Sequence, residues 1–111
     1  MDVILEKNTD VSVIRLVGRM NAVTVKPFEE QMMQCIGNGE TRLLVDFTGC
    51  DYIDSSGLRV LLIGMKRLMA SGGKMALFGL NPHITKVFTI AGLHVVFPLK
   101  ETEQDAIAAV S

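Results

Sequence analysis

A serine pair flanked by an aspartate and a glycine is the part of the sequence best suited to chemistry. It lies in the segment Asp54-Ser55-Ser56-Gly57-Leu58, where we expect a helix to begin. A helix start has free backbone N–H groups and a positive partial charge, so it accommodates an anion such as a phosphate. A phosphate on a serine at this position would add roughly −1.5 to −2 charges to the surface without disrupting its own helix.

The helix that follows is predicted from apolar residues at helical spacing over residues 56–70. Its stripe is formed by Leu58, Leu61, Leu62, Met65, Leu68 and Met69. Asp and Ser are preferred N-caps, so Asp54, Ser55 and Ser56 also fit a helix cap with no further role. Position alone favours that structural interpretation, and both interpretations stay open.

The predicted outward side of this helix carries two branched aliphatic residues. At spacings i, i+4, i+7 and i+11 it presents Ser56, Val60, Ile63 and Arg67, with Arg59 beside them. A solvated face with two stray aliphatic residues and a partner surface explain this pattern about equally well. In a partner surface, Val60 and Ile63 would be apolar anchors, and the arginines would orient the partner.

Segments that resemble strands and helices alternate along the rest of the chain. Runs rich in Val, Ile and Leu predict strands at residues 3–6, 11–17, 43–47, 74–78 and 95–97. Polar residues at 7–10 suit a hairpin turn. Besides the helix at 56–70, helices are predicted to begin at the caps Thr24, Asn81 and Thr102.

Alternation of this kind is typical of βαβ units with right-handed crossovers. The first two strands, joined by a short turn, should form an antiparallel edge. We therefore predict an α/β fold with a mixed, mostly parallel sheet of about five strands and about four helices. We expect it to form one domain over residues 1–111.

Composition excludes several classes of function. The 11 basic and 12 acidic residues give a net charge of −1 and form no basic stripe, so we do not expect direct nucleic-acid binding. Charged residues interrupt every apolar run, and the N-terminus lacks the features of a signal peptide. We therefore expect a cytoplasmic protein without membrane insertion.

Metal and catalytic chemistry also lack their usual motifs. Cys35 and Cys50 stand apart, without a C-x-x-C pattern or paired histidines, so we expect neither a metal site nor a cofactor. The serine pair lacks the Gly-x-Ser-x-Gly elbow of hydrolases, and His83 and His94 are the only histidines. We expect no catalytic residues, and a small enzyme is the weakest hypothesis.

The motif at residues 54–58, between an apolar strand and an amphipathic helix, resembles the signature of STAS domains. More narrowly, it is similar to that of the bacterial anti-sigma factor antagonists. The resemblance covers essentially the whole chain, including Gly18-Arg19-Met20-Asn21, Ser71-Gly72-Gly73 and Asn81-Pro82. Where this family commonly has an aspartate, the chain has Asn21, which keeps hydrogen bonding but lacks the charge.

The resemblance implies a phosphoswitch on Ser55, in an environment formed by Asp54, Ser56, Gly57 and Asn21. Unphosphorylated, such a protein binds an anti-sigma factor that is also a serine kinase, and this frees a sigma factor. Phosphorylation disfavours the complex until a serine phosphatase restores it, so the protein is a ligand and substrate rather than a catalyst. The alternative is a non-switching STAS interaction or scaffold module, such as a transport-associated subunit, in which Ser55 is only a helix cap. Oligomeric state is not indicated.

Overall fold

The computed structural model describes residues 1–8 and 10–111. Its strands are β1 (Asp2–Lys7), β2 (Ser12–Met20), β3 (Arg42–Ile53), β4 (Lys74–Phe78) and β5 (Leu99–Lys100). Its helices are α1 (Val25–Gly37), α2 (Ser55–Ala70), α3 (Pro82–Ile90), the short 3-10 helix η1 (Leu93–Val95) and α4 (Glu103–Ala109). The hairpin turn predicted at residues 7–10 includes Thr9, which lies outside the described residues.

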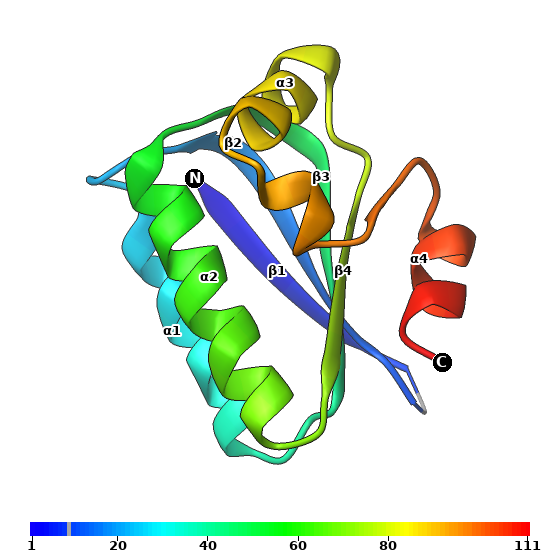
Figure 1. Cartoon of the computed structure of the whole chain (residues 1–111). Coiled ribbons are helices and arrows are strands. Elements are labelled where there is room, and N and C mark those ends of the chain that lie inside the picture. The colour runs from blue at the N-terminus through cyan, green and yellow to red at the C-terminus, as the bar shows by residue number, and fades with distance from the viewer. Residues whose placement is uncertain (9) are drawn as a thin grey trace.

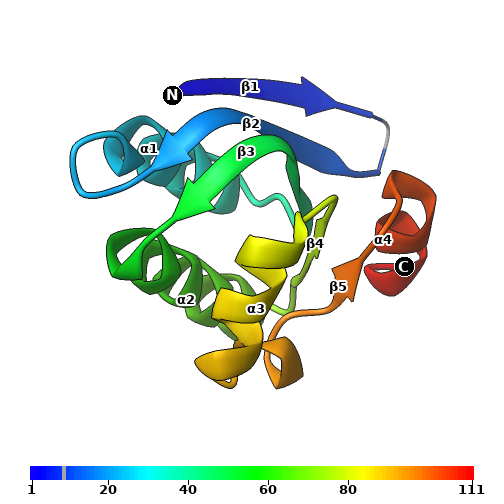
Figure 2. The same cartoon turned by 90° about the horizontal axis from the view of Figure 1, so that it is seen from above.

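The strands form one sheet in the order β1-β2-β3-β4-β5. β1 is antiparallel to β2, and each of the other neighbouring pairs is parallel. Helices α1, α2 and α3 cover one face of the sheet, and α4 packs on the other (Figure 1; Figure 2). This arrangement confirms the predicted mixed, mostly parallel sheet with its antiparallel N-terminal edge.

The central strand β3 explains why its sequence is a continuous apolar run. Leu43, Val45 and Phe47 pack under α1, α2 and α3, while Leu44 packs under α4, so both faces are buried. β3 also continues to Ile53, beyond the predicted strand at residues 43–47. The extension pairs with β2 across two register shifts and carries the chain directly to the serine motif.

The strand predicted at residues 95–97 is wrong. That region contains η1, where the N–H groups of Val96 and Phe97 donate to the carbonyl of Leu93. Phe97 is a core anchor in edge-to-face contact with Phe88, whereas Val95 is exposed. An apolar triplet of this kind resembles a strand in sequence, but the strand β5 lies two residues further on and pairs with β4.

α2 buries a stripe rotated from the predicted one. Its buried residues are Gly57, Val60, Leu61, Gly64, Met65 and Leu68. Met69, which belonged to the predicted stripe, is exposed instead. The rotation follows from the glycines, because a Cβ on Gly64 would overlap the Sδ and Cε atoms of Met32 in α1. The missing side chain therefore allows α1 and α2 to approach closely.

We expect Gly64→Ala to lower the free energy of unfolding by about 1–2 kcal/mol, because overpacking against Met32 outweighs the better helix propensity of Ala. Urea unfolding measures this difference. Gly37→Ala is the matched control, since a Cβ there has no neighbour within 4 Å, and it should leave stability unchanged or slightly raised. A Gly64→Ala protein as stable as the wild type would contradict the close contact.

An ion-pair cluster around Arg15 connects elements on the α4 side of the sheet. From β2, its guanidinium donates to Glu6 on β1 at 2.7 Å, to Asp46 on β3 at 2.9 Å and to Glu103 on α4 at 3.0 Å. Asp46 is buried, so removal of Arg15 would leave its carboxylate without this cation. The hydrogen bond from Arg15 also lowers the pKa of Glu6 below its ordinary value.

We expect Arg15→Met to lower the free energy of unfolding at neutral pH by about 2–4 kcal/mol, because Asp46 stays buried without its cation. The pKa of Glu6 is lower in the folded state than in the unfolded state. Its contribution is therefore present above the unfolded pKa and lost as pH falls through the folded pKa.

Urea unfolding between about pH 7 and pH 3 should accordingly show a steeper loss of stability for the wild type than for Arg15→Met. Lys26→Met, at an exposed position, is the control and should follow the wild type. Identical pH profiles for wild type and Arg15→Met would contradict the stabilising role of the cluster.

Candidate functional site

The serine motif lies at the carboxyl ends of the adjacent parallel strands β2 and β3. Met20 and Ile53 pair at these ends, and the Asp54 N–H donates to the Met20 carbonyl at 3.1 Å. Figure 2 shows both strands pointing to the side of the sheet where α1 and α2 begin. The loop after β2, which contains Asn21, therefore lies beside the start of α2, as the resemblance to the STAS family implied.

Asp54 is the N-cap of α2. Its backbone is extended, and its Oδ1 accepts hydrogen bonds from the Ser56 N–H at 2.9 Å and the Gly57 N–H at 3.4 Å. Ser55 is the first helical residue and is exposed, while Ser56 is half-buried. Of the three residues that fit a cap, Asp54 therefore makes the capping contacts, and Ser55 is left exposed at the first helical position.

Gly57 fixes the height of α2 above the sheet. A Cβ at this position would lie 2.5 Å from the Met20 Sδ and 2.7 Å from the Ile53 Cγ1. Only glycine allows the first turn of the helix to rest directly on the ends of β2 and β3. Gly57 thus positions Ser55 without contacting any ligand itself.

Asn21 closes the turn between β2 and α1. Its Oδ1 accepts from the N–H groups of Val23 at 2.9 Å and Thr24 at 3.1 Å. Thr24 is the N-cap residue of α1, as predicted, but its side chain makes no capping bond. Its hydroxyl donates to the Arg19 carbonyl and accepts from the Asn21 N–H. A carboxylate could accept the same bonds as Asn21, so the amide changes the charge of this loop and not its fold.

The partner surface predicted on α2 is a groove between α1 and α2. Val60 was expected to face outward, but it is buried because α1 covers it. The groove encloses about 290 Å³ and is lined by Ala22, Val25, Glu29, Ser56, Arg59, Val60 and Ile63. Four of the five predicted partner residues therefore come together, with Ile63 exposed at its edge, and Arg67 lies outside the lining.

Sequence reasoning missed the α1 side of this groove. Ala22, Val25 and Glu29 line it, but the periodicity of one helix does not show which neighbour faces it. Gly57 and Gly64 were the available signal, because small residues seven positions apart lie on one helix face and permit a close neighbour. Across the groove, Glu29 and Arg59 supply one charge of each sign.

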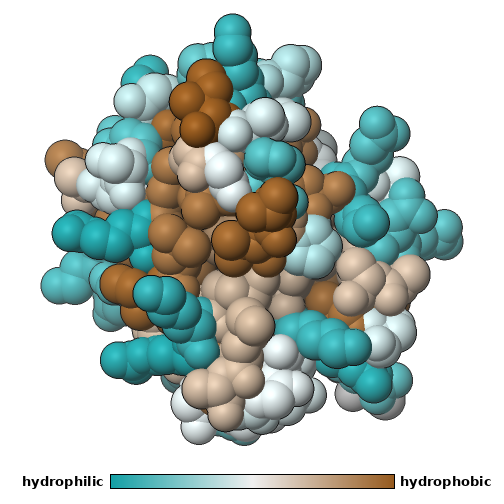
Figure 3. All heavy atoms as spheres, viewed as in Figure 1, coloured by the Kyte–Doolittle hydropathy of each residue, from teal (hydrophilic) through white to brown (hydrophobic). Residues whose placement is uncertain are grey.

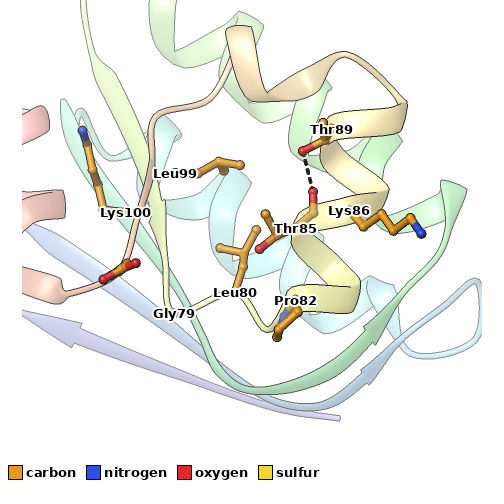
Figure 4. Close-up of a pocket in the computed structure, with 9 residues that line it drawn as sticks. Gly79, Leu80, Pro82, Thr85, Lys86, Thr89, Leu99 and Lys100 are labelled. Carbon is orange, nitrogen blue, oxygen red and sulfur yellow. Dashed lines mark hydrogen bonds between the residues drawn. The ribbon is translucent and has the colours of Figure 1, made fainter.

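A larger hollow of about 770 Å³ lies at the ends of β4 and β5, beside α3 (Figure 4). Its two threonine hydroxyls are already hydrogen-bonded to the backbone of α3 and its cap. Thr85 donates to the Asn81 carbonyl, and Thr89 donates to the Thr85 carbonyl. Lys86 extends away from it in Figure 4. The charged residues that line the hollow are Lys86, Lys100 and Glu101.

Residues 1–8 and 10–111 show neither a metal-binding cluster nor a membrane-spanning helix. Their His, Cys, Asp and Glu side chains form no group of three or more that could hold a metal ion. None of the helices in these ranges combines the length and apolar character needed to cross a membrane. Burial raises the pKa of the Cys35 and Cys50 thiols, which favours their neutral forms.

Known proteins are similar to this chain over nearly its entire length. BtrV of Bordetella bronchiseptica, a candidate anti-sigma factor antagonist, is 32% identical over 98% of this chain and 94% of its own length. The anti-sigma-B factor antagonist of Listeria monocytogenes is 30% identical over 90% of this chain and 88% of its own length.

Solved structures agree with these sequence relatives. The phosphorylated form of SpoIIAA, a Bacillus cell fate determinant, superposes with a TM-score of 0.76 at 29% identity, covering 96% of this chain and 97% of that one. The unphosphorylated form of the same anti-sigma factor antagonist gives a TM-score of 0.75 at 29% identity, with 96% of each chain covered.

The motif, the fold and the relatives thus agree with one another. Residues 2–106 of the sequence also match the STAS domain family, and this range includes every residue of the site described above. This chain belongs to the STAS domain family.

Proposed function

We propose that this protein is an anti-sigma factor antagonist whose binding is switched by phosphorylation of Ser55. With Ser55 unmodified, it binds an anti-sigma factor that is also a serine kinase, and so releases a sigma factor in the cytoplasm. Phosphorylation by that partner ends the interaction, and a serine phosphatase reverses it. The observation that carries the proposal is the exposed Ser55 hydroxyl at the first position of α2, next to the groove.

The relatives support the general role. BtrV and the Listeria monocytogenes protein are described as antagonists of anti-sigma factors, the former as a candidate. SpoIIAA has both a phosphorylated and an unphosphorylated form, and it is 29% identical to this chain. A protein that serves as ligand and substrate in this way needs no catalytic residues of its own.

The geometry suggests how a phosphate would act. Asp54 already accepts the N–H groups of Ser56 and Gly57, so a phosphate on Ser55 would lie on the solvent side of the helix start. The helix dipole favours an anion there, and α2 need not unfold. A partner that closes over the groove would have to bury this charge, at a cost of several kcal/mol, and each 1.4 kcal/mol weakens binding tenfold.

The groove accounts for affinity and orientation in this proposal. Val60 and Ile63 provide an apolar floor and edge, and Arg59 stands opposite Glu29 to select a partner with complementary charges. Asn21 leaves the neighbouring loop uncharged, so this loop adds no repulsion toward an incoming phosphate or acidic partner. Arg67, one turn beyond the groove, would contribute at most at the rim.

We expect the anti-sigma factor kinase of the source organism, supplied with ATP, to add one phosphate to the protein, on Ser55. Ser55→Ala should abolish the mass increase, and Ser56→Ala, one position along the same helix, should retain it. Ser55→Asp should weaken binding to that kinase by roughly tenfold or more, because it places a charge at the interface. Intact-mass measurement with peptide mapping and titration calorimetry provide these readouts.

Two results would count against the switch. Phosphate mapped to Ser56 would move the site, and binding that is indifferent to Ser55→Asp would favour the non-switching STAS interaction module.

We also expect Ile63→Asp to weaken binding of the same kinase by roughly 10- to 100-fold, because a charge replaces an apolar anchor at the groove edge. Ile63 is the suitable position because it is exposed, whereas a charge at the buried Val60 would unfold the protein. Ile4→Asp, at a similarly exposed residue on the α4 face of the sheet, is the matched control and should bind normally. Unchanged binding by Ile63→Asp would exclude the groove as the interface.

A further inference from the structure

The charges of the chain are segregated along the sequence. Between Asp54 and Glu101 there is no acidic residue, and all 12 Asp and Glu residues lie outside residues 55–100. The same stretch contains six of the 11 Lys and Arg residues and both histidines. It folds into α2, β4, α3, η1 and β5, so these elements carry positive charge only.

The same stretch also exposes several large apolar side chains. Val95 is 79% exposed, Ile90 76%, Met69 62% and Val96 41%. Figure 3 shows apolar side chains gathered at the centre of this face of the molecule, over α2, α3 and η1, with hydrophilic groups around them. Met69 and Val96 also line one shared hollow of about 390 Å³.

We call Met69, Ile90, Val95 and Val96, with the basic residues Lys66, Lys74 and Lys86, the α2–α3 face. It is distinct from the groove that serves the proposed function, because Ile63 lines the groove with α1, whereas Met69 lines the separate hollow with Val96. Lys74 lines the shared hollow, where its Nζ donates to the main-chain oxygen of Ser111 at 3.1 Å, and Lys66 and Lys86 are exposed on α2 and α3. Each charged side chain that these elements contribute is therefore basic.

The combination of protruding apolar groups and charges of one sign identifies the kind of surface that this face fits. Ile90 and Val95 are the last residues of α3 and η1, so their side chains stand out from helix ends and do not line a groove. An interface between proteins usually pairs charges of both signs around its apolar centre. A bilayer of anionic phospholipids offers both features that would complement this face, a negatively charged surface and an apolar interior.

We propose that the α2–α3 face docks onto the anionic phospholipid surface of a membrane. The apolar side chains enter the boundary between headgroups and acyl chains, and the exposed Lys66 and Lys86 contact the phosphates. The docking is peripheral and reversible, because a few inserted side chains and basic residues give only moderate affinity. It does not depend on the phosphoswitch, since its residues lie outside the groove.

Co-sedimentation of the full chain with vesicles tests this proposal without any protein partner. We expect binding to phosphatidylglycerol vesicles and none to phosphatidylcholine vesicles, with the binding lost at roughly 1 M salt. Lys66→Gln and Lys86→Gln should each weaken binding by roughly fivefold, because each basic residue near an anionic surface raises the binding affinity by about that amount.

The apolar contribution has a matched control on the opposite face of the sheet. Ile90→Gln with Val95→Gln should weaken vesicle binding by roughly tenfold or more, because the inserted groups are lost. Ile4→Gln with Val17→Gln changes two exposed aliphatic residues on the α4 face, and binding should remain at the wild-type level. Circular dichroism of all variants verifies that they fold.

Three results would overturn the proposal. These are failure to bind phosphatidylglycerol vesicles, equal losses in the two double variants, and binding to soluble poly-glutamate as tight as to vesicles with no effect of Ile90→Gln and Val95→Gln. The last result would instead indicate an acidic protein partner. None of them bears on Ser55, so the proposed function is tested separately.

Discussion

The close approach of α2 to the sheet and to α1 determines where the functional surface lies. Gly57 lets the first turn of α2 rest on Met20 and Ile53, and Gly64 lets its middle contact Met32. These two contacts fix both the height and the rotation of the helix. Ser55 consequently projects from the end of the strands, and Val60 turns into the contact with α1, where it forms the floor of a groove.

Local sequence signals predicted the order of helices and strands well, because each signal depends on residues that are close together in the sequence. Alternating apolar segments gave the parallel sheet, and Asn81 and Thr102 are indeed N-caps, accepting hydrogen bonds from the N–H groups of Ile84 and Asp105. The errors lie where tertiary contacts decide. Residues 95–97 are apolar enough for a strand, but Phe97 is required in the core beside Phe88, and β3 lengthens because β2 offers it a pairing partner.

The candidate site was predictable to the extent that one motif encodes it. Asp54, Ser55 and Gly57 are consecutive or nearly so, and Asn21 joins them because parallel strands bring their carboxyl ends to one edge. The groove was not predictable from α2 alone. Its other wall comes from α1. The hydrophobic stripe of α2 was identified from its large apolar side chains, so the glycines on the buried side of the helix were not recognised.

The segregated charge divides this nearly neutral protein into elements with a net charge of +6, from residues 55–100, and elements with a net charge of −7, from the rest of the chain. A net charge of −1 describes the molecule only at distances much greater than its own size, which has principal extents of 31, 26 and 23 Å. Within a Debye length of about 10 Å at 0.1 M salt, an approaching charged body meets the two ends separately and exerts a torque before contact. Diffusing molecules therefore arrive already rotated, and the same chain can adhere to cation and anion exchange resins through different sides.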